Sequence, residues 1–600
     1  MLQHLRLPLA LGLLLGLAAC ASTSGDSIGS LPDTRNADLD KTLTAAGKKK
    51  GDEATSLYLA AADLAWQQGD SLKARSLLES LNLDHALPAR KIFANTLSAE
   101  LALARKQPEM ALQLLQDPAF DRLAELPVAQ QVRSQEARAR ALEESGQLLP
   151  AVRERIYMAG LLDQQAAGNN LESTWSLVSR LQMPVDSRAN ETELRGWLAL
   201  SRMVRGNGSL VEKQLKLREW IAANSLHPAA RQLPAELDKL LALQPQPLQR
   251  VALLLPSHDR NQKVVNALRN GFLARYYEAR ESGQTVPELL FYDSNQTGSP
   301  EELYRQLQQD QVDLLIGPWE KELVTRLAEQ ASLPVATLAL NYADNHTSQA
   351  TSNLYQFGLS AEDEARMAAE RAWADGMRNA VVLVQAGDWG RRVQAAFAGH
   401  WQQLGGTLVD SVYLGQPVEL AQQLGSLLRL RDSEERSKKL ADTLQTRIHS
   451  QPGRRRDVDF VFLAAPSQLA RQVRPTLIFQ YAGDLPVYAT SAINPGSQDS
   501  ALLHDLDGIT FTEVPWLLNT SDPLKDGIIN RWPEAASLMG RFYAMGADTY
   551  QLAVQLQLLQ ALPNTSTEGL TGQMQLGKQN RVERHTGWAQ FVDGKLEPLP

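Results

Sequence analysis

Cys20 is the only cysteine among the 600 residues, and its thiol is the most nucleophilic side chain that the sequence offers. Without a second cysteine it cannot form an intramolecular disulfide. It follows Arg6 and an apolar run over residues 7–19, which is the charge and hydropathy pattern of a secretory signal. The run is shorter than the roughly 20 residues that cross a bilayer. The sequence therefore predicts a signal segment over 1–19 that ends at its one reactive side chain.

The tetrapeptide Leu17-Ala18-Ala19-Cys20 resembles the lipobox of bacterial lipoproteins. In that family the cysteine is diacylated on sulfur, freed by cleavage on its N-terminal side and acylated again. Several acyl chains anchor a protein stably, whereas one chain binds only marginally. Residue 21 is Ala rather than the Asp that retains many such lipoproteins in the inner membrane, so the resemblance implies the outer membrane, facing the periplasm. The alternative is an ordinary signal peptide with a chance cysteine.

Residue patterns of metal-dependent catalysis are absent from the sequence. There is no His-Glu-x-x-His motif, and the nine His residues never fall at metal-ligand spacing. The stretch 572–579 departs from a phosphate-binding loop because Gln579 stands where Ser or Thr should bind magnesium. We therefore expect no catalytic residue, no metal and no cofactor. The formal net charge of −8 gives no general attraction to nucleic acid.

A small set of polar and aromatic residues follows the expected strands, where the mouth of a ligand cleft would lie. These candidate cleft residues are Ser257, Trp319, Tyr342, Asp388, Trp389 and Ser491. The aromatic side chains either stack on a ligand or fill the cleft and hold its walls together. Asp388 either faces the cleft or caps the helix that begins near Trp389.

The N-terminal half reads as a tether followed by helices. Residues 20–45 are rich in Ser, Thr, Gly and Asp, the composition of a flexible linker. From 46 to 245 the pattern is helical, and Ala74, Ala111 and Ala151 occupy equivalent positions 37 and 40 residues apart. This resembles tetratricopeptide repeats of about 34 residues, with degenerate repeats and stretched turns. The alternative is an irregular helical domain without a binding role.

After a Pro-punctuated break the pattern changes to alternating strands and helices, from 250 to 600. The run 251–255 is continuously apolar, as in a parallel strand buried on both faces. Two successive sets predict a doubly wound α/β domain of two lobes joined by several hinge strands. We expect strands over 251–255, 288–292, 313–316, 334–340, 380–384, 407–413, 459–463 and 486–489, and helices over 264–281, 300–309, 320–329, 361–376, 389–404, 417–450 and 467–480.

The stretch between Leu427 and Asp457 carries many charges of both signs. It lengthens the second lobe beyond a minimal two-lobed domain. Mixed charge at helical spacing is typical of a solvated helix, and a docking surface is the alternative.

Specific segments carry a resemblance over 250–600 to type I periplasmic binding proteins. The landmarks are 251–256, 314–318, 334–341 and 457–464. Further segments point to one branch of that superfamily: 357–366, 387–390, 486–491, 546–553, 569–572 and 584–591. With the lipobox and the helical repeats in front, the chain resembles the outer-membrane lipoprotein activators of class A penicillin-binding proteins (the LpoA family).

The resemblance implies a multidomain fold with an all-α N-terminal solenoid and a two-lobed α/β domain. It also implies a role without catalysis: binding a bifunctional peptidoglycan synthase, a class A penicillin-binding protein, and stimulating its crosslinking. The rival function is a periplasmic receptor for an amino acid or a sugar. The loop 257–263 contains no Gly, unlike ligand-binding relatives whose backbone approaches the ligand there. We therefore do not expect a small-molecule ligand.

Overall fold

The computed structural model describes residues 27–34, 37–181, 191–344, 350–415, 419–445, 453–497, 499–518, 521–562 and 565–599. The chain divides into two compact units, Met1–Leu194 and Arg195–Pro600. Cys20 and the expected signal segment 1–19 lie outside the described residues. Within the described ranges, no helix combines the length and the apolar character needed to cross a membrane.

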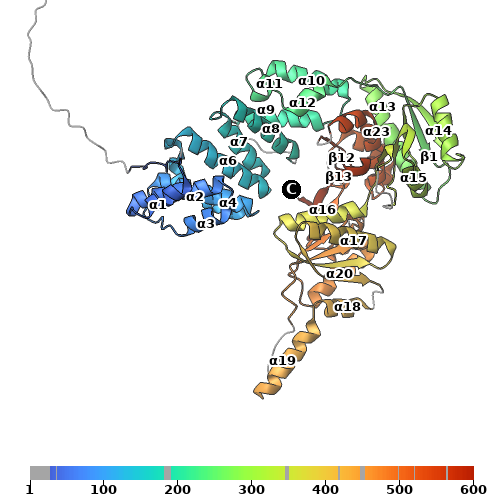
Figure 1. Ribbon diagram of the computed structural model, residues 1–600. Coiled ribbons are helices and arrows are strands. Elements are labelled where there is room, and N and C mark those ends of the chain that lie inside the picture. The colour runs from blue at the N-terminus through green and yellow to red at the C-terminus, as the bar shows by residue number, and fades with distance from the viewer. Residues whose placement is uncertain are drawn as a thin grey trace, which may run out of the picture. The chain divides into compact units, whose positions relative to one another are not determined.

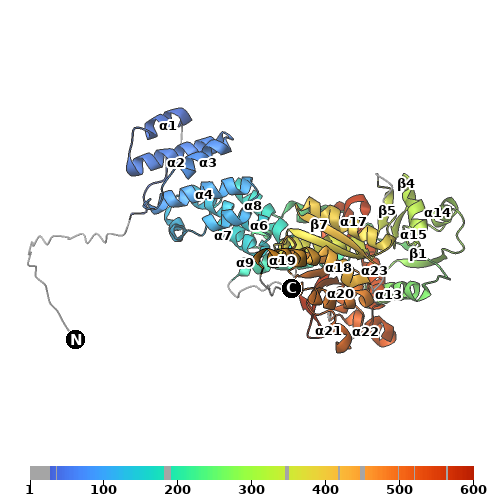
Figure 2. The same ribbon diagram turned by 90° about the horizontal axis from the view of Figure 1, so that it is seen from below.

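The first unit consists of helices that pair along the chain (Figure 2). They are α1 (Leu39–Ala46), α2 (Gly51–Gln67), α3 (Ser71–Glu79), α4 (Pro88–Ala104), α5 (Pro108–Leu114), η1 (Pro118–Glu125), α6 (Val128–Glu144), α7 (Leu148–Ala159) and α8 (Gln164–Arg180). The equivalent alanines Ala74, Ala111 and Ala151 lie on α3, α5 and α7, and each is fully buried. A methyl side chain lets two helices approach closely, so the predicted pairing of helices is confirmed.

The repeats are longer than the ideal because residues are inserted between the helix pairs. The turns within the pairs, 68–70, 105–107 and 145–147, are short. Residues 80–87 separate α3 from α4, and the 3-10 helix η1 separates α5 from α6. The sequence predicted stretched turns, whereas the structure places the extra length between successive repeats.

Residues 20–45 were expected to form a flexible tether, but the first unit is packed from Ile28 onward. Helix α1 starts at Leu39, which is buried, and the side chain of Asp38 accepts a hydrogen bond from the backbone N–H of its first turn. Ile28 and Leu31 pack against the core beside α4. These few apolar side chains lie in a polar stretch, so composition alone assigned them to the linker.

The border between the units also differs from the expected one, which lay between 245 and 250. It falls inside α9 (Thr192–Arg205), so α10 (Leu210–Ala223), α11 (Pro228–Arg231) and α12 (Ala235–Ala242) belong to the second unit. Polar contacts fix these helices to the C-terminal chain. Lys213 donates to Gln555 Oε1 over 3.2 Å, and Thr565 donates to Glu236 Oε1 over 2.6 Å. Helical periodicity could not reveal this, because it does not say what a helix packs against.

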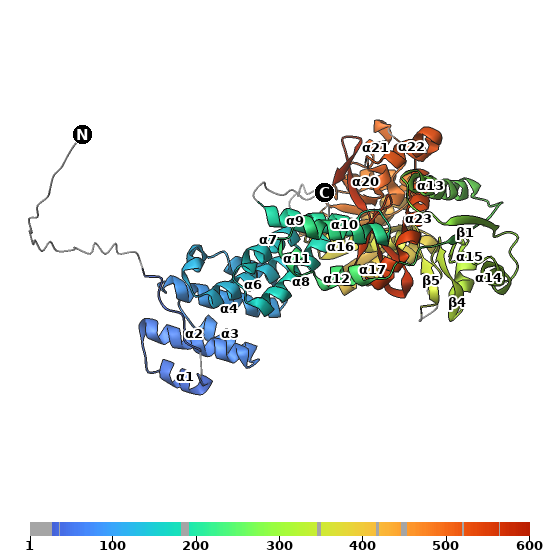
Figure 3. The same ribbon diagram turned by 90° about the horizontal axis from the view of Figure 1, so that it is seen from above.

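The first lobe of the second unit is a parallel sheet covered on both faces. Its strands are β1 (Arg250–Leu255), β2 (Glu288–Asp293), β3 (Leu314–Ile316), β4 (Ser332–Ala339) and β5 (Ser352–Gln356), in the order β2-β1-β3-β4-β5. Its helices are α13 (Gln262–Glu281), α14 (Pro300–Gln309), α15 (Lys321–Ala328) and α23 (Gly540–Ala561). Val251 and Leu253 face α13 and α23, whereas Ala252 and Leu254 face α14 and α15. This explains the continuously apolar β1; Figure 3 shows these elements together.

The second lobe has a mixed sheet in the order β15-β14-β10-β9-β8-β6-β7. Its strands are β6 (Asn379–Gln385), β7 (Thr407–Leu414), β8 (Phe460–Ala464), β9 (Val487–Ala489), β10 (Ile509–Glu513), β14 (Gly587–Val592) and β15 (Lys595–Leu599). Helices α16 (Ala361–Ala374) and α17 (Asp388–Gln403) cover one face, and α18 (Leu420–Leu427) and α20 (Ser467–Phe479) cover the other. Because β14 and β15 pair antiparallel, the C-terminal hairpin closes the edge of an otherwise parallel sheet.

Two details of the lobes differ from the expectation. The strand over 334–340 was expected to close the first set, but β5 adds an edge strand beyond β4. The expected helix 417–450 is broken: α18 ends, Arg429 adopts a positive φ of 54°, and α19 (Leu430–Leu444) begins. In Figure 1, α19 projects away from the body of the second lobe.

The chain crosses between the lobes at residues 357–361, 513–540 and 585–587, the three crossovers. A small sheet of β11 (Ser566–Glu568), β12 (Gln573–Leu576) and β13 (Val582–His585) precedes the third crossover. The predicted fold class, a helical N-terminal part followed by a two-lobed α/β domain, is confirmed.

Two glycines bring α13 and α23 into close contact within the first lobe (Figure 1). A Cβ at Gly271 would lie 2.0 Å from the carbonyl oxygen of Tyr543, and a Cβ at Gly546 would lie 2.0 Å from that of Leu268. Each glycine therefore makes room for the backbone of the other helix. Gly546 begins the segment 546–553 that carried the family resemblance, so this part of the motif has a packing reason.

Candidate functional site

A cavity of about 540 Å³ lies between the two lobes of the second unit. Its walls come from the first and second crossovers, the first turn of α16, the start of α17 and the segment after β9. The lining includes the apolar side chains of Leu359, Trp389, Leu538 and Phe542. The volume lies within the range of about 300–1,000 Å³ that is usual for ligand pockets. This cavity is the cleft of the two-lobed domain.

Glu364 is a buried carboxylate in the wall of this cleft. It lies in the first turn of α16, whose N-cap Ser360 accepts a hydrogen bond from the backbone N–H of Asp363. Glu364 accepts one hydrogen bond from the backbone N–H of Ser491 over 2.8 Å and another from the hydroxyl of Ser491 over 2.9 Å. Burial raises the pKa of Glu364, although Arg541 and the hydrogen bonds oppose this shift. Both carboxylate oxygens of Glu364 are therefore already hydrogen-bonded within the protein.

Arg541 joins the two lobes across the back of the same cavity. It belongs to α23 of the first lobe, and it donates to both carboxylate oxygens of Glu513, the last residue of β10, over 3.0 and 2.5 Å. The Glu513 side chain is fully buried and also accepts a hydrogen bond from Asn494 over 2.7 Å. Arg541 further donates to the carbonyl oxygen of Ser491. We call the pair of Arg541 and Glu513 the interlobe ion pair.

The charges in the cleft are therefore matched within the protein. Glu364 is held by Ser491, and Arg541 is held by Glu513. A ligand would meet mainly the apolar faces of Trp389 and Phe542. The arrangement can hold two lobes together, but it offers no unmatched charge to polarise a substrate.

Of the predicted cleft residues, Trp389 and Ser491 do line the cavity. Trp319 lies next to it: its ring meets that of Phe542 edge to face, with centroids 6.4 Å apart. Trp389 packs against the core beside α16 and α17, and Trp319 packs against the core of the first lobe. The aromatic side chains thus fill the space between the elements, one of the two roles expected for them.

Tyr342, Ser257 and Asp388 do not line the cavity. The hydroxyl of Tyr342 donates to the carbonyl oxygen of Val582 over 2.8 Å, so this residue holds the small sheet of β11, β12 and β13 against the first lobe. Burial raises the pKa of Tyr342. Ser257 is exposed, and its backbone N–H donates to Asp293. Asp388 is exposed and pairs with Arg391 of the same helix. Strand ends alone did not predict which of these residues face the cleft.

Glu364, Glu513 and Arg541 were missed by the sequence analysis. Glu364 lies inside the segment 357–366 that carried the family resemblance, and this was the available signal. Arg541 and Glu513 belong to different elements and are separated by a crossover. Only the fold brings their side chains together.

Other resemblance segments meet at the hinge. Asp548 is fully buried on α23 and accepts hydrogen bonds from the backbone N–H groups of Leu570 and Thr571, over 2.8 and 2.7 Å. Arg584 donates to the carbonyl oxygens of Thr571 and Gly358, over 3.3 and 3.1 Å. The segments 546–553, 569–572, 584–591 and 357–366 therefore form one polar joint beside the crossovers.

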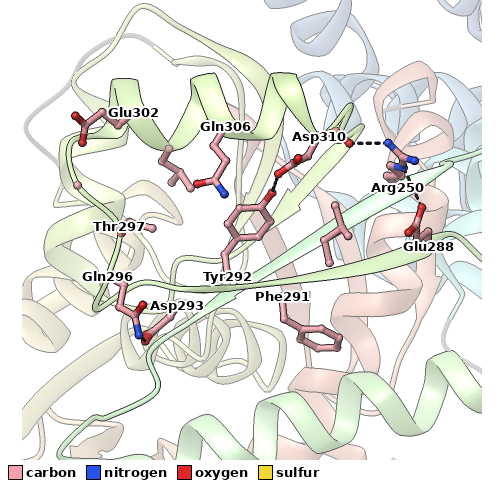
Figure 4. A pocket seen from close by; sticks show the side chains of 13 residues that line it. Arg250, Glu288, Phe291, Tyr292, Asp293, Gln296, Thr297, Glu302, Gln306 and Asp310 are labelled. Atoms are coloured by element: carbon pink, nitrogen blue, oxygen red, sulfur yellow. Dashed lines mark hydrogen bonds and ion pairs between the residues drawn. The ribbon is translucent and has the colours of Figure 1, made fainter.

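A larger hollow, of about 830 Å³, opens at the edge strand β2 beside α14 (Figure 4). Its charged side chains have partners nearby: Arg250 pairs with Glu288, and Tyr292 donates a hydrogen bond to Asp310. Asp293 accepts hydrogen bonds from Ser257. These groups stabilise the edge of the sheet, so the hollow offers no convergent site. Across the described ranges, no cluster of His, Cys, Asp and Glu is placed to hold a metal ion.

Comparison with known proteins decides the family. A family model described as "LppC putative lipoprotein" matches residues 32–594. The chain belongs to this LppC family. Penicillin-binding protein activator LpoA of Aliivibrio fischeri is 28% identical over 597 residues, which cover 97% of each chain. The activator of the same name from Photobacterium profundum is 29% identical over 470 residues, covering 77% of this chain and 76% of that protein.

The solved structure of Haemophilus influenzae LpoA matches the LppC chain at 25% identity, covering 94% of this chain and 98% of the other, with a TM-score of 0.52. The LppC match begins at residue 32, next to Leu31 in the first packed segment. It ends at Gly594, in the turn between β14 and β15. It therefore spans both compact units, including the cleft and the polar joint of the hinge.

Proposed function

We propose that this chain is a non-catalytic activator of a class A penicillin-binding protein and stimulates the crosslinking of peptidoglycan. The observation that carries the proposal is the match to penicillin-binding protein activators along 97% of both chains. A match confined to the two lobes would be equally consistent with a transport receptor. The match here also takes in the helical first unit.

The cleft supports an activator rather than an enzyme or a receptor. Its carboxylate and its guanidinium are matched by Ser491 and Glu513, which a substrate or a charged ligand would have to displace. Leaving one partner of a buried charge pair unmatched costs several kcal/mol. We infer that the cleft region, with Trp389 and Ser491 in its wall, sets the relative position of the lobes.

The chain is a member of a lipoprotein family, and we place its lipid on Cys20, after a signal segment over 1–19. Ala21 in place of Asp favours the outer membrane, by the family rule for sorting. The residues between Cys20 and the first packed side chain, Ile28, would then join the anchor to the first unit. Cys20→Ala tests the anchor, because the variant should remain an unprocessed precursor and leave the outer-membrane fraction.

Activation requires that the chain bind the active state of the synthase more tightly than its inactive state, since a ligand shifts an equilibrium only by its differential affinity. The test is a reconstituted assay of a purified class A synthase with its lipid-linked substrate. Residues 21–600 are added in solution, and the crosslinked fraction of the product is measured after digestion. We expect the crosslinked fraction to rise.

A heat-denatured sample of the same chain serves as the control, and the chain without synthase should form no product. An unchanged crosslinked fraction with every class A synthase of the source cell would contradict the activator proposal. Product formed by the chain alone would contradict the non-catalytic part of it.

A further inference from the structure

The first unit contains a separate cavity of about 510 Å³, bounded by η1, α6 and α7. Gln131, Gln135, Arg138 and Leu142 line it from α6, at the i, i+4, i+7 and i+11 spacing of a single helix face. Residues of α7 line it at the same kind of spacing, ending at Tyr157. Two helix faces therefore line this space, and η1, the insertion that lengthens the repeat, forms its remaining wall.

Gln135 is the unusual member of this lining. Its side chain is 6% exposed, and its Oε1 accepts no hydrogen bond from any of the described residues. Buried polar atoms are nearly always hydrogen-bonded, because an unmatched one loses its hydration without compensation. Gln130 on the same helix is buried and hydrogen-bonded: its amide donates to Ser134 over 3.0 Å and to Thr96 over 3.3 Å. Gln135 thus places a buried amide oxygen without a hydrogen-bond partner in the wall of a cavity of ligand size.

The charges around Gln135 argue against an ionic ligand. Arg138 donates to the carbonyl oxygen of Leu115 over 2.6 Å and pairs with Glu154 over 3.4 Å. Arg153 is held by both carboxylate oxygens of Glu191. The cations in the lining are therefore neutralised, and a phosphate or carboxylate would find no free positive charge. A neutral ligand fits better.

Two features narrow the class of neutral ligand. Tyr157 lies on the rim with 63% of its surface exposed, so its ring can cover the flat face of a ligand. A hydroxyl group both donates and accepts, so it satisfies the amide of Gln135 whichever way that amide is turned. Flat faces bordered by hydroxyl or acetamido groups are the surface chemistry of an amino sugar.

We propose that this cavity between η1, α6 and α7 binds a neutral saccharide, with an N-acetylated sugar ring stacked on Tyr157 and hydrogen-bonded to Gln135. The site lies in the first unit, and its assay needs no synthase. The outcome of this test is therefore independent of the outcome of the test for the activator role.

The test measures binding to residues 21–600 by calorimetry and saturation-transfer NMR. The saccharide probe is tetra-N-acetylchitotetraose, and the peptide probe is tetra-alanine. We expect the saccharide to bind and the peptide not to bind. Gln135→Leu and Tyr157→Ala should each weaken saccharide binding by about 10-fold or more, a factor that corresponds to about 1.4 kcal/mol.

Gln130→Leu is the matched control, because it removes a glutamine from the same helix that is already hydrogen-bonded. It should lower the melting temperature and leave saccharide binding unchanged, whereas Gln135→Leu should leave the melting temperature unchanged or higher. No saccharide binding at millimolar probe would overturn the proposal. Binding of the peptide alone, or saccharide binding that neither Gln135→Leu nor Tyr157→Ala weakens, would overturn it equally.

Discussion

The carboxylate of Glu364 accepts both the backbone N–H and the hydroxyl of Ser491, and this contact ties the first turn of α16 to the segment that follows β9. Both side chains are buried in the wall of the cleft. The contact fixes the polar edge of the cavity from within one lobe, while Arg541 reaches the same segment from the other lobe. Ser491 therefore contacts Glu364 of its own lobe and Arg541 of the other lobe.

Glu364 should make the stability of the second unit depend on pH. Burial raises its pKa above the usual value, so the folded state holds the proton more strongly than the unfolded state. The resulting stabilisation is fully present below the unfolded pKa of about 4.3 and is lost as the pH rises through the raised folded value. We expect Glu364→Gln to match the parent in acid and to be more stable at pH 7. Urea unfolding at several pH values measures this, and equal stability at pH 7 would count against it.

The interlobe ion pair should be costly to break from either side. Arg541→Met leaves Glu513 buried without its partner, and Glu513→Gln leaves Arg541 likewise. Each single substitution should lower the free energy of unfolding by about 3–5 kcal/mol. The double variant should lose clearly less than the sum of the two, because it leaves no unmatched charge. Additive losses in a double-mutant cycle would show that the two side chains do not interact across the lobes.

Any side chain at Gly546 should destabilise the close packing of α13 against α23. A Cβ there would lie 2.0 Å from a backbone oxygen, which cannot move without moving the whole helix. Gly546→Ala should therefore cost at least the roughly 1–3 kcal/mol typical of overpacking. Gly399→Ala on α17 is the matched control, because nothing lies within 4 Å of its Cβ position. That substitution should stabilise by up to about 1 kcal/mol through helix propensity. Calorimetric melting of both variants compares the two effects.

The sequence predicted the elements of the two lobes well where one physical signal dominated. β1 is apolar at every position because both of its faces are covered, and such a run is hard to mistake. The packed helix pairs of the first unit were marked by Ala74, Ala111 and Ala151, which are small at the positions where helices touch. Local pattern and burial agree at these places.

The parts that were missed depend on contacts between distant segments. Helix α23 is buried on most sides, so it lacks the polar face that marks an ordinary surface helix. Arg541 becomes a cleft residue only because the second crossover returns the chain to the first lobe. Asp388 was expected either to face the cleft or to cap the following helix, and it does neither, because it pairs with Arg391 in solvent and Gly387 is the N-cap. Which strand ends face one another is a property of topology, and periodicity does not contain it.

Lys213 should give the second unit an opposite pH dependence, at alkaline pH. Its amino group is buried between α10 and α23, where it donates to the carbonyl oxygen of Val204 and to Gln555. Burial, reinforced by the nearby charge of Lys216 and opposed by Glu212, lowers the pKa of Lys213 to about 7. The unfolded lysine keeps its proton up to a pKa of about 10.4, so between these values the unfolded chain binds more protons than the folded chain. The free energy of unfolding should therefore rise with pH from about 7 towards 10.

Lys213→Met should remove this rise while preserving most of the packing of the aliphatic stem. Lys216→Met on the exposed side of the same helix is the matched control, and it should keep the slope. Urea unfolding at pH 7, 8 and 9 distinguishes the two variants. A slope that survives in Lys213→Met would assign the pH dependence to another group. A slope lost in both variants would mean that the charge of Lys216, rather than burial, sets the protonation of Lys213.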